Sequence, residues 1–201
     1  MKKISKILIG TNNKGKFKEI SDLLPKKIKK ISPNQLNISS PEENGKTFIE
    51  NSEIKAEYFS LKSKMVTISD DSGLEVSCLD GMPGIYSSRW AEDLGGFDNA
   101  MKEIIKRVIK INKNKDKKNT EAKFICALTI KWPNGKKITE IGQVEGNIIS
   151  QRGKNGFGYD QIFTPKGHKR TFGEMIYEEK ASMDHRFFAF KKIEKKIKDY
   201  F

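Results

Sequence analysis

The sequence has few of the residues that mark several common classes of protein. Its 201 residues include only two cysteines and two histidines. Two cysteines do not form a disulfide framework, and neither Cys78 nor Cys126 has metal-ligand spacing to a histidine. A reducing cytoplasm is therefore the expected compartment. No apolar run approaches the roughly 20 residues that cross a bilayer, and the apolar stretch at residues 7–9 is too short for an export signal.

Arginine is also scarce. The formal charge is +13, yet only five of the 39 Lys and Arg residues are arginine, and the lysines are scattered along the chain. Sequence-specific DNA-binding proteins usually concentrate arginine beside polar base-reading residues. We therefore interpret the lysines as solvated surface that retains a modest attraction for polyanionic small molecules. Without a repeat or a linker, residues 1–201 are expected to form a single domain.

Hydrophobic periodicity predicts alternating strands and helices in the first half of the chain. Residues 6–9 form a short apolar strand, and a polar turn and a helix follow it. The capping-box pattern at residues 47–50 predicts a helix that runs to about Lys62. Residues 65–69 are expected to form a second short strand that presents residues 70–73 at its C-terminal end.

The second half predicts a hairpin between helices. Residues 124–132 alternate as in a strand, and the chain turns and returns over residues 138–144. Helix is expected again from about Phe172, so the fold class is a mixed-sheet α/β protein. Asp98 is expected to cap a further helix, whose buried face would consist of Met101, Ile104, Ile105, Val108 and Ile111.

Residues 11–16 (TNNKGK) lie between the first strand and its helix. Backbone N–H groups at a helix N-terminus are unsatisfied and suit a phosphate. Thr11 and Asn13 can donate hydrogen bonds, Gly15 allows close approach of the backbone, and Lys16 adds a charge. The spacing is not that of a P-loop, and a polar helix cap without a ligand explains these residues equally well.

Two pairs of carboxylates stand out in this lysine-rich chain, Glu42 with Glu43 and Asp70 with Asp71. Mg²⁺ usually takes one or two carboxylates together with substrate phosphates, and a carboxylate beside it can accept a proton from water. A turn, a helix cap or an acidic approach to a helix is the alternative for each pair. Lys55 lies in mid-helix, where a lysine is usually a solvated surface group.

Residues 156–160 (GFGYD) contain two glycines that flank Phe157. Such a loop suits the stacking of a base on a ring, which is worth about 1–3 kcal/mol. Lys180, followed by His185 and Arg186, could donate to a base carbonyl. Turn chemistry and ordinary surface positions are the alternatives at these sites.

In this order the segments resemble the inosine triphosphate pyrophosphatases, a family also called dITP/XTP pyrophosphatases. The matching residues are 7–16, 42–56, 69–89, 156–160 and 178–186. The resemblance implies a mixed central sheet flanked by helices, in two lobes with the active-site cleft between them. It also implies a homodimer, Mg²⁺ as the cofactor and a nucleoside triphosphate as the small-molecule substrate.

The resemblance also implies residue roles. The triphosphate would be held by Thr11, Asn13, Lys16 and Lys55. Mg²⁺ would bind Glu42 and Asp71, and Asp71 would accept a proton from the attacking water. Ser72 would touch the substrate. The base would be contacted or framed by Phe157, Gly158, Tyr159, Asp160, Lys180, His185 and Arg186.

Attack at the α-phosphorus would release pyrophosphate and a monophosphate, mainly through positioning and charge neutralisation. Hypoxanthine and xanthine carry a carbonyl where adenine carries an amino group, so a donor at that edge favours them, and a mismatched donor costs about 1–3 kcal/mol. Arg186 is the candidate donor. Gln161 and Asp184 depart from the family pattern, which has Pro and Ser there, and Asp184 puts base preference in doubt.

Three other functions fit parts of the sequence. A related pyrophosphatase acting on pyrimidine triphosphates would share the fold and the opening motif. A basic nucleic-acid-binding protein would bind with steep salt dependence but leaves the carboxylate pairs unexplained. A non-catalytic nucleotide sensor would not need the second carboxylate pair. The phenylalanines near the C-terminus could belong to a core or a dimer interface, namely Phe187, Phe188 and Phe190.

Overall fold

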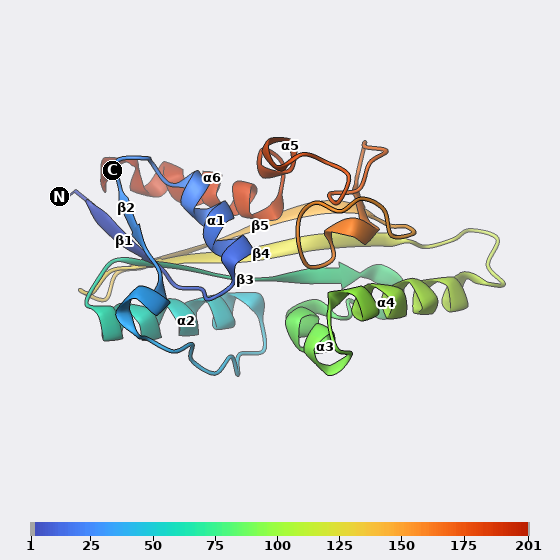
Figure 1. The fold of residues 1–201 in the computed structure, drawn as a ribbon, viewed down its shortest axis with the longest axis horizontal. Helices are drawn as coiled ribbons and strands as arrows, with labels where there is room; N and C mark the ends of the chain where they lie inside the picture. Colours follow the sequence, from blue (N-terminus) through green and yellow to red (C-terminus); the bar gives the residue numbers. More distant parts are fainter. Residues whose placement is uncertain (1–2, 201) are drawn as a thin grey trace. The chain divides into compact units, whose positions relative to one another are not determined.

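A mixed six-stranded sheet runs through the computed structural model, which describes residues 3–200, in the order β2-β1-β3-β4-β5-β6 (Figure 1). The chain divides into two compact units. Unit 1 contains the residues up to Asp71, Cys126–Gly142 and the residues from His185 onward, and unit 2 contains Ser72–Ile125 and Gln143–Asp184. The predicted mixed sheet with helices is confirmed.

Unit 1 begins with a strand, a turn and a helix, as the periodicity predicts. Its strand β1 pairs in parallel with β2 and with β3. Its helices and its first two strands are β1 (Lys6–Ile9), α1 (Lys14–Leu23), β2 (Lys29–Ile31), α2 (Phe48–Ser63) and α6 (His185–Ile197), with a short 3-10 turn at Pro33–Leu36.

The pleat of β1 distributes its side chains over two cores. Ile7 and Ile9 pack with Ile20 of α1 and with side chains of α6, whereas Leu8 packs with Phe59 of α2. Successive strand residues point to opposite faces of a sheet. Within unit 1, α1 and α6 therefore cover one face and α2 covers the other (Figure 1).

Helix α2 begins where the capping pattern predicts, but only half of the capping box forms. The Thr47 side chain accepts a hydrogen bond from the Glu50 backbone N–H at 3.1 Å. The Glu50 carboxylate accepts from the Lys46 backbone N–H at 2.6 Å instead of from that of Thr47. The helix ends at Ser63, and Lys64 adopts the left-handed conformation (φ 56°).

Strand β3 (Thr67–Val76) corrects the prediction of a short strand that ends at residue 69. Asp70 and Asp71 lie inside it, and both are buried. A buried carboxylate disfavours a strand interior only when it has no partner. Here cationic side chains from α1, α2 and α6 supply the partners, so the strand continues through both aspartates.

Unit 2 has a core of its own, rich in aromatic rings. The Phe124 and Phe163 ring centroids are 4.7 Å apart, and those of Phe163 and Phe172 are 5.4 Å apart. Strands β4 (Glu121–Lys131) and β5 (Lys137–Ile148) contribute residues to both units. The remaining elements, all in unit 2, are β6 (Phe163–Pro165), antiparallel to β5, and α3 (Ser87–Asp93), α4 (Phe97–Asn112) and α5 (Tyr177–Ala181).

Two helix predictions need correction. The N-cap of α4 is Gly96 and not Asp98, which lies in the first turn, and Ile111 is 37% exposed on that helix. The helix expected from Phe172 is two helices, α5 and α6, because Phe172 and Met175 bury their side chains in the unit 2 core from irregular backbone. No helix among residues 3–200 combines the length and the apolar character needed to cross a membrane.

Candidate active site

The turn after β1 is a capped helix N-terminus. The Asn13 side-chain oxygen accepts from the Lys16 backbone N–H at 3.0 Å, and the Asn13 backbone N–H donates to Thr11 Oγ1 at 3.2 Å. Capping uses only the acceptor of Asn13, so its Nδ2 and the Thr11 hydroxyl hydrogen remain as donors. The cap and the predicted phosphate contact are therefore compatible.

Close packing fixes the start of this turn. A Cβ atom at Gly10 would lie 2.2 Å from Ser69 Oγ and 2.7 Å from Phe59 Cδ2. Only glycine allows β1 to leave the sheet this close to β3 and α2. The turn therefore begins directly beside the strand that carries Asp70 and Asp71.

Asp70 lies in a buried charge network inside unit 1. Its Oδ2 is 3.3 Å from Lys16 Nζ and 3.1 Å from both Nε and Nη2 of Arg186. Arg186 Nη1 also donates to Glu19 Oε2 at 2.8 Å and lies 3.1 Å from His185 Nε2. Two cations thus face two carboxylates, which compensates the cost of burying them.

This network changes the interpretation of Arg186. Its side chain is 2% exposed, and Nε, Nη1 and Nη2 all contact groups of unit 1. In this arrangement Arg186 clamps Asp70 to Glu19, and its contact with a base edge stays a prediction. Sequence reasoning missed Glu19, which carried no signal beyond its place one turn after Lys16 on α1.

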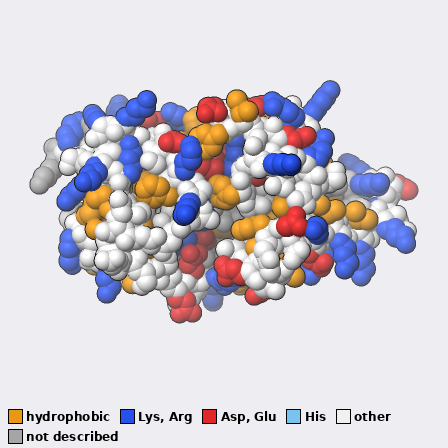
Figure 2. Space-filling model, viewed as in Figure 1, with side chains coloured by type: hydrophobic (Ala, Val, Ile, Leu, Met, Phe, Trp, Pro, Cys, Tyr) orange, Lys and Arg blue, Asp and Glu red, His pale blue; other side chains and the backbone are white. Residues whose placement is uncertain are grey.

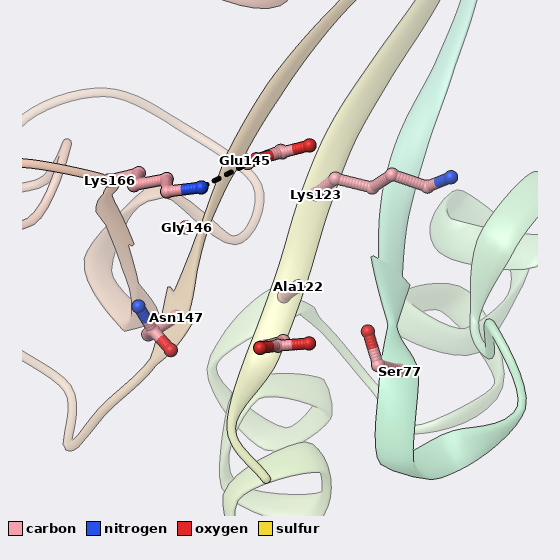
Figure 3. A pocket seen from close by; sticks show the side chains of 8 residues that line it. Ser77, Ala122, Lys123, Glu145, Gly146, Asn147 and Lys166 are labelled. Carbon is pink, nitrogen blue, oxygen red and sulfur yellow. Dashed lines mark hydrogen bonds and ion pairs between the residues drawn. The ribbon is translucent and has the colours of Figure 1, made fainter.

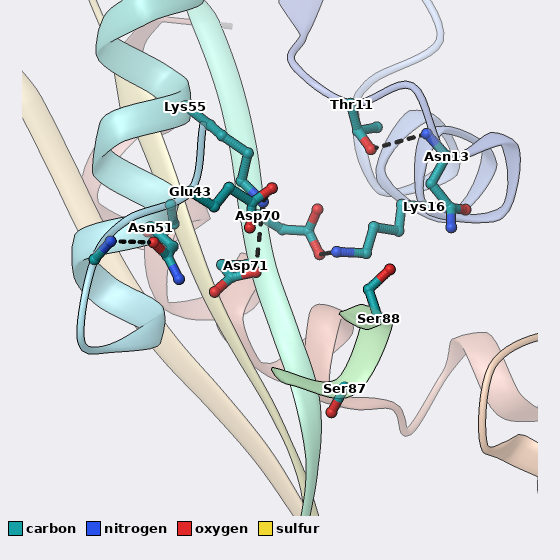
Figure 4. Close-up of polar contacts among 12 residues, drawn as sticks. Thr11, Asn13, Lys16, Glu43, Asn51, Lys55, Asp70, Asp71, Ser87 and Ser88 are labelled. Carbon is teal, nitrogen blue, oxygen red and sulfur yellow. Dashed lines mark hydrogen bonds and ion pairs between the residues drawn. The ribbon is translucent and has the colours of Figure 1, made fainter. Parts of the chain in front are cut away.

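Lys55 is not a surface residue. It is 6% exposed, and its Nζ lies 2.9 Å from Glu43 Oε1 and 3.4 Å from Asp71 Oδ1 (Figure 4). Burial would lower the pKa of Lys55, but the carboxylates of Asp71, Glu43 and Asp70 outweigh it and raise that pKa. Lys55 therefore stays cationic, and spacing alone could not predict its burial.

Burial raises the pKa of the Asp71 carboxyl, against the opposing effect of Lys55 and Lys16. Its Oδ2 is buried without a hydrogen-bond partner among the residues that the structure describes. Of the predicted pair at residues 42–43, Glu43 joins Asp71 and Lys55, whereas Glu42 is exposed. The structure thus brings Lys16, Lys55 and Asp71 together with Asp70 and adds Glu43 to them.

The carboxylate oxygens of this cluster suit a hard divalent cation whose remaining ligands are oxygens of the substrate phosphates. Within residues 3–200 no three or more His, Cys, Asp or Glu side chains are arranged to hold a metal ion. Mg²⁺ commonly uses only one or two protein carboxylates together with phosphate oxygens. The buried Asp71 Oδ2 and the 35% exposed Glu43 side chain, with a net charge of −1 once Lys55 is included, meet that requirement.

In unit 2 the loop at residues 156–160 is held by Asp160. Its Oδ2 accepts from the Phe157 backbone N–H at 2.8 Å and from Lys180 Nζ at 2.7 Å. Lys180 Nζ also lies 4.7 Å from the centroid of the Phe157 ring, a cation–π distance. Asp160 and Lys180 are buried while Phe157 is half-buried, so Phe157 is the ring that can meet a ligand.

Tyr159 is not available for stacking. It is 2% exposed, its hydroxyl donates to the Ser87 carbonyl at 2.8 Å, and its ring packs edge-to-face on Phe97 at 5.2 Å. Burial raises the pKa of its hydroxyl. Tyr159 therefore anchors the loop, where Gly158 adopts a positive φ of 65°. Ser72 is half-buried in β3.

Two cavities in unit 2 are not lined by the predicted site residues. One, of about 320 Å³, has two lysines on its wall that are both paired, Lys123 with Glu75 and Lys166 with Glu145 (Figure 3). The other, of about 480 Å³, is lined by residues 78–80, Met82, Arg107, Lys110 and Ile111. Lys and Arg side chains are spread over much of the visible face (Figure 2), which supports their interpretation as solvated surface.

The fold and the site define an α/β protein with a capped helix N-terminus, a buried lysine and, among residues 3–200, a buried carboxylate oxygen without a hydrogen bond in one unit. The sequence profile of the Ham1 family matches residues 7–196, and the chain belongs to the Ham1 family. A protein of Zymomonas mobilis subsp. mobilis named dITP/XTP pyrophosphatase is 40% identical over 190 residues, 94% of this chain and 90% of that protein. One of Caulobacter vibrioides with the same name is 39% identical over 97% of this chain and 99% of its own length.

Solved structures give the same result. The HAM1 protein from Coxiella burnetii superposes with a TM-score of 0.84 and 30% identity, covering 98% of this chain and 100% of its own. A nucleoside-triphosphatase / dITP/XTP pyrophosphatase from Mycobacterium abscessus gives a TM-score of 0.73 and 30% identity, covering 94% and 98%. The resemblance inferred from the motifs is confirmed, and so is the fold class.

Proposed function

We propose that this chain hydrolyses the triphosphates of non-standard purines, ITP, dITP and XTP, to the nucleoside monophosphate and pyrophosphate. The observation that carries the proposal is the cluster of Lys16, Lys55, Asp70 and Asp71 in unit 1. It combines cations for a polyphosphate with a carboxylate oxygen left without a partner. The relatives named dITP/XTP pyrophosphatase match along nearly the whole chain.

Lys16 and Lys55 neutralise the triphosphate, and Thr11 and Asn13 donate hydrogen bonds to it beside the N-terminus of α1. Asp71 accepts a proton from the water that attacks the α-phosphorus. When Mg²⁺ is bound, it neutralises phosphate charge and lowers the pKa of its bound water.

The carboxylates have distinct proposed tasks. Asp71 remains a metal ligand in the proposal, and Glu42 stays a predicted second ligand. Glu43 becomes an additional candidate because its carboxylate contacts Lys55 beside Asp71. Asp70 contacts Lys16 and Arg186 through its Oδ2 and is proposed to hold the lysine in place. Replacing Glu42 and Glu43 singly by glutamine, and measuring the Mg²⁺ dependence of each, assigns the second ligand.

The base is proposed to contact unit 2 at the loop with Phe157, Gly158 and Asp160, held by Lys180 and Tyr159. Ser72 follows Asp71 in β3 and is proposed to touch the substrate. In unit 1, Arg186 holds Asp70 and contacts His185, and both residues stay predicted to frame the base. Asp184, directly before α6, is 2% exposed, and we propose that it caps this helix, a position that favours aspartate.

Three further properties belong to the proposal. The two free cysteines favour a cytoplasmic location. A single catalytic domain over residues 1–201 and a homodimer are proposed from the family resemblance. Phe188, 42% exposed on α6, is a candidate contact residue of the dimer. Light scattering on the purified chain measures the oligomeric state directly.

The decisive experiment is incubation of the chain with ITP and Mg²⁺ followed by product analysis. IMP with pyrophosphate is expected, whereas IDP with orthophosphate would mean that a different bond is cut. A panel of dITP, XTP, dGTP, dTTP and UTP then tests the base. Preference for a pyrimidine triphosphate would replace the purine proposal by the related pyrimidine enzyme.

A further inference from the structure

Asn51 of α2 has one satisfied and one unsatisfied side-chain group. It is fully buried, and its Oδ1 accepts from the Gly45 backbone N–H at 2.8 Å. Because an N–H can only donate, this contact fixes which end of the amide is oxygen. Nδ2 is then a buried donor with no hydrogen-bond partner among residues 3–200. A buried donor that makes no hydrogen bond destabilises the fold, so its retention calls for a ligand.

Local packing keeps the amide in this orientation. A Cβ atom at Gly45 would lie 2.6 Å from Asn51 Oδ1, so the loop approaches α2 as closely as a backbone can. The next N–H, that of Lys46, is bound by the Glu50 carboxylate. Asn51 therefore cannot rotate its amide to pair Nδ2 without leaving Gly45 unsatisfied.

The position of Asn51 relates it to the carboxylate cluster. It lies one helical turn before Lys55 on the same face of α2, and Gly45 follows Glu43 by two residues. Lys55 contacts both Glu43 and Asp71, and Figure 4 draws these side chains beside α2. Asp71 Oδ2 is likewise buried and unpartnered. Asn51 Nδ2 and Asp71 Oδ2 are thus a donor and an acceptor at the same cluster that have no hydrogen bond within residues 3–200.

We propose that Asn51 Nδ2 positions the attacking water, an inference that rests on the proposed function. The ligand must accept from Nδ2 and donate to Asp71 Oδ2, and water can do both whereas a phosphate oxygen cannot donate. One lone pair of the water accepts from Asn51 while another attacks the α-phosphorus. The water O–H proton passes to Asp71 Oδ2, the new P–O bond forms, and the bond to the β-phosphate oxygen breaks with its electrons on pyrophosphate.

The test replaces only the donor. Asn51→Asp keeps an oxygen for Gly45 and removes Nδ2, so kcat for ITP should fall about 10²-fold. KM should change less than about threefold, and the affinity for inorganic pyrophosphate, measured by calorimetry, should stay as in the wild type, because the water does not bind the triphosphate. Asn51→Ser repeats the measurement without a new carboxylate and should lose kcat by a similar factor.

Asn112 is the matched control, since it is also a buried asparagine in a helix. Its Nδ2 donates to the carbonyls of Val108 and Asn119 at 2.8 and 2.9 Å, so Asn112→Asp should lower Tm without changing kcat. A kcat within threefold of wild type in folded Asn51→Asp or Asn51→Ser overturns the inference alone. A wild-type chain that releases no pyrophosphate from any triphosphate overturns the proposed function itself.

Discussion

Asp70 and Asp71 are consecutive residues of β3 whose carboxylates contact different helices. Asp70 binds Lys16 of α1 and Arg186 of α6, whereas Asp71 binds Lys55 of α2. The pleat of the strand separates two neighbouring acids in this way. Asp70 contacts two cations through its Oδ2, whereas Asp71 contacts Lys55 through Oδ1 and has a buried Oδ2 without a hydrogen bond among residues 3–200. Their different proposed tasks therefore follow from the continuation of β3 through both residues.

Asp71→Asn is expected to abolish turnover and leave the fold intact. The change removes the proton acceptor and one metal ligand, while an amide still fits beside Lys55. Pyrophosphate release measured against wild type should fall at least about 10³-fold, with Tm within a few degrees. Release close to the wild-type rate would refute the assignment of Asp71 as the base.

Lys55→Ala should raise KM for ITP and lower kcat together. The buried ammonium is lost from a site that binds phosphate, and a charge-assisted contact is worth about 1.5–3 kcal/mol, or roughly 10- to 100-fold in kcat/KM. Lys62→Ala is the control, since Lys62 lies on the same helix and is exposed. An unchanged KM in Lys55→Ala would make the role of that lysine purely structural.

Arg186→Ala should destabilise the chain by about 3–5 kcal/mol, because it leaves Asp70 and Glu19 buried without their cation. Urea unfolding measures the difference. Arg170→Ala removes an exposed pair with Glu179 and should cost less than about 1 kcal/mol. If Arg186→Ala kept wild-type stability and lost only base selectivity, Arg186 would be a base-reading residue as the motif suggests.

The motifs predicted the site better than they predicted how its residues are used. The turn after β1 and the later aspartates could be predicted because the residues that define each of them lie within a short stretch of sequence. The partners of Arg186 could not, since Asp70 and Glu19 lie 116 and 167 residues away in sequence. Only the folded sheet brings these groups together, and only their pairing makes a buried arginine stable.

The other differences between the predicted and the observed roles of residues arise because the side chains concerned are buried. Tyr159 belongs to a segment that suits base stacking, yet its hydroxyl is held by Ser87 in the core of unit 2. The sequence around Lys55 is typical of a surface lysine, yet its side chain is buried and contacts two carboxylates. The local sequence specifies residue type and helix phase. It does not show whether a residue distant in sequence packs against a given face of the helix.

Glu53→Gln tests a polar link between α2 and the β4–β5 hairpin. Burial would raise the pKa of Glu53, but its contacts with Lys137 and Thr139 outweigh it and lower that pKa. The carboxylate therefore contributes stability above its unfolded-state pKa of about 4.3, and the contribution disappears as the pH falls through the lower folded-state pKa. Urea unfolding should show a difference of at most about 1 kcal/mol at pH 7 that vanishes in acid. A difference independent of pH would exclude the charge as its cause.

Gly156→Ala should destabilise unit 2 more than Gly167→Ala does. Both glycines have a positive φ, 74° and 83°, so each substitution pays the left-handed backbone cost of about 1–2 kcal/mol. Only at Gly156 would the new methyl group lie 2.1 Å from Asp160 Oδ2, whereas nothing lies within 4 Å at Gly167. The clash pushes Asp160 away from Lys180 and from the Phe157 N–H, so KM for ITP should rise in Gly156→Ala and stay unchanged in Gly167→Ala. Thermal unfolding and steady-state kinetics on the pair measure both effects, and equal losses in the two variants would show that backbone strain alone, and not the position of Asp160, governs this loop.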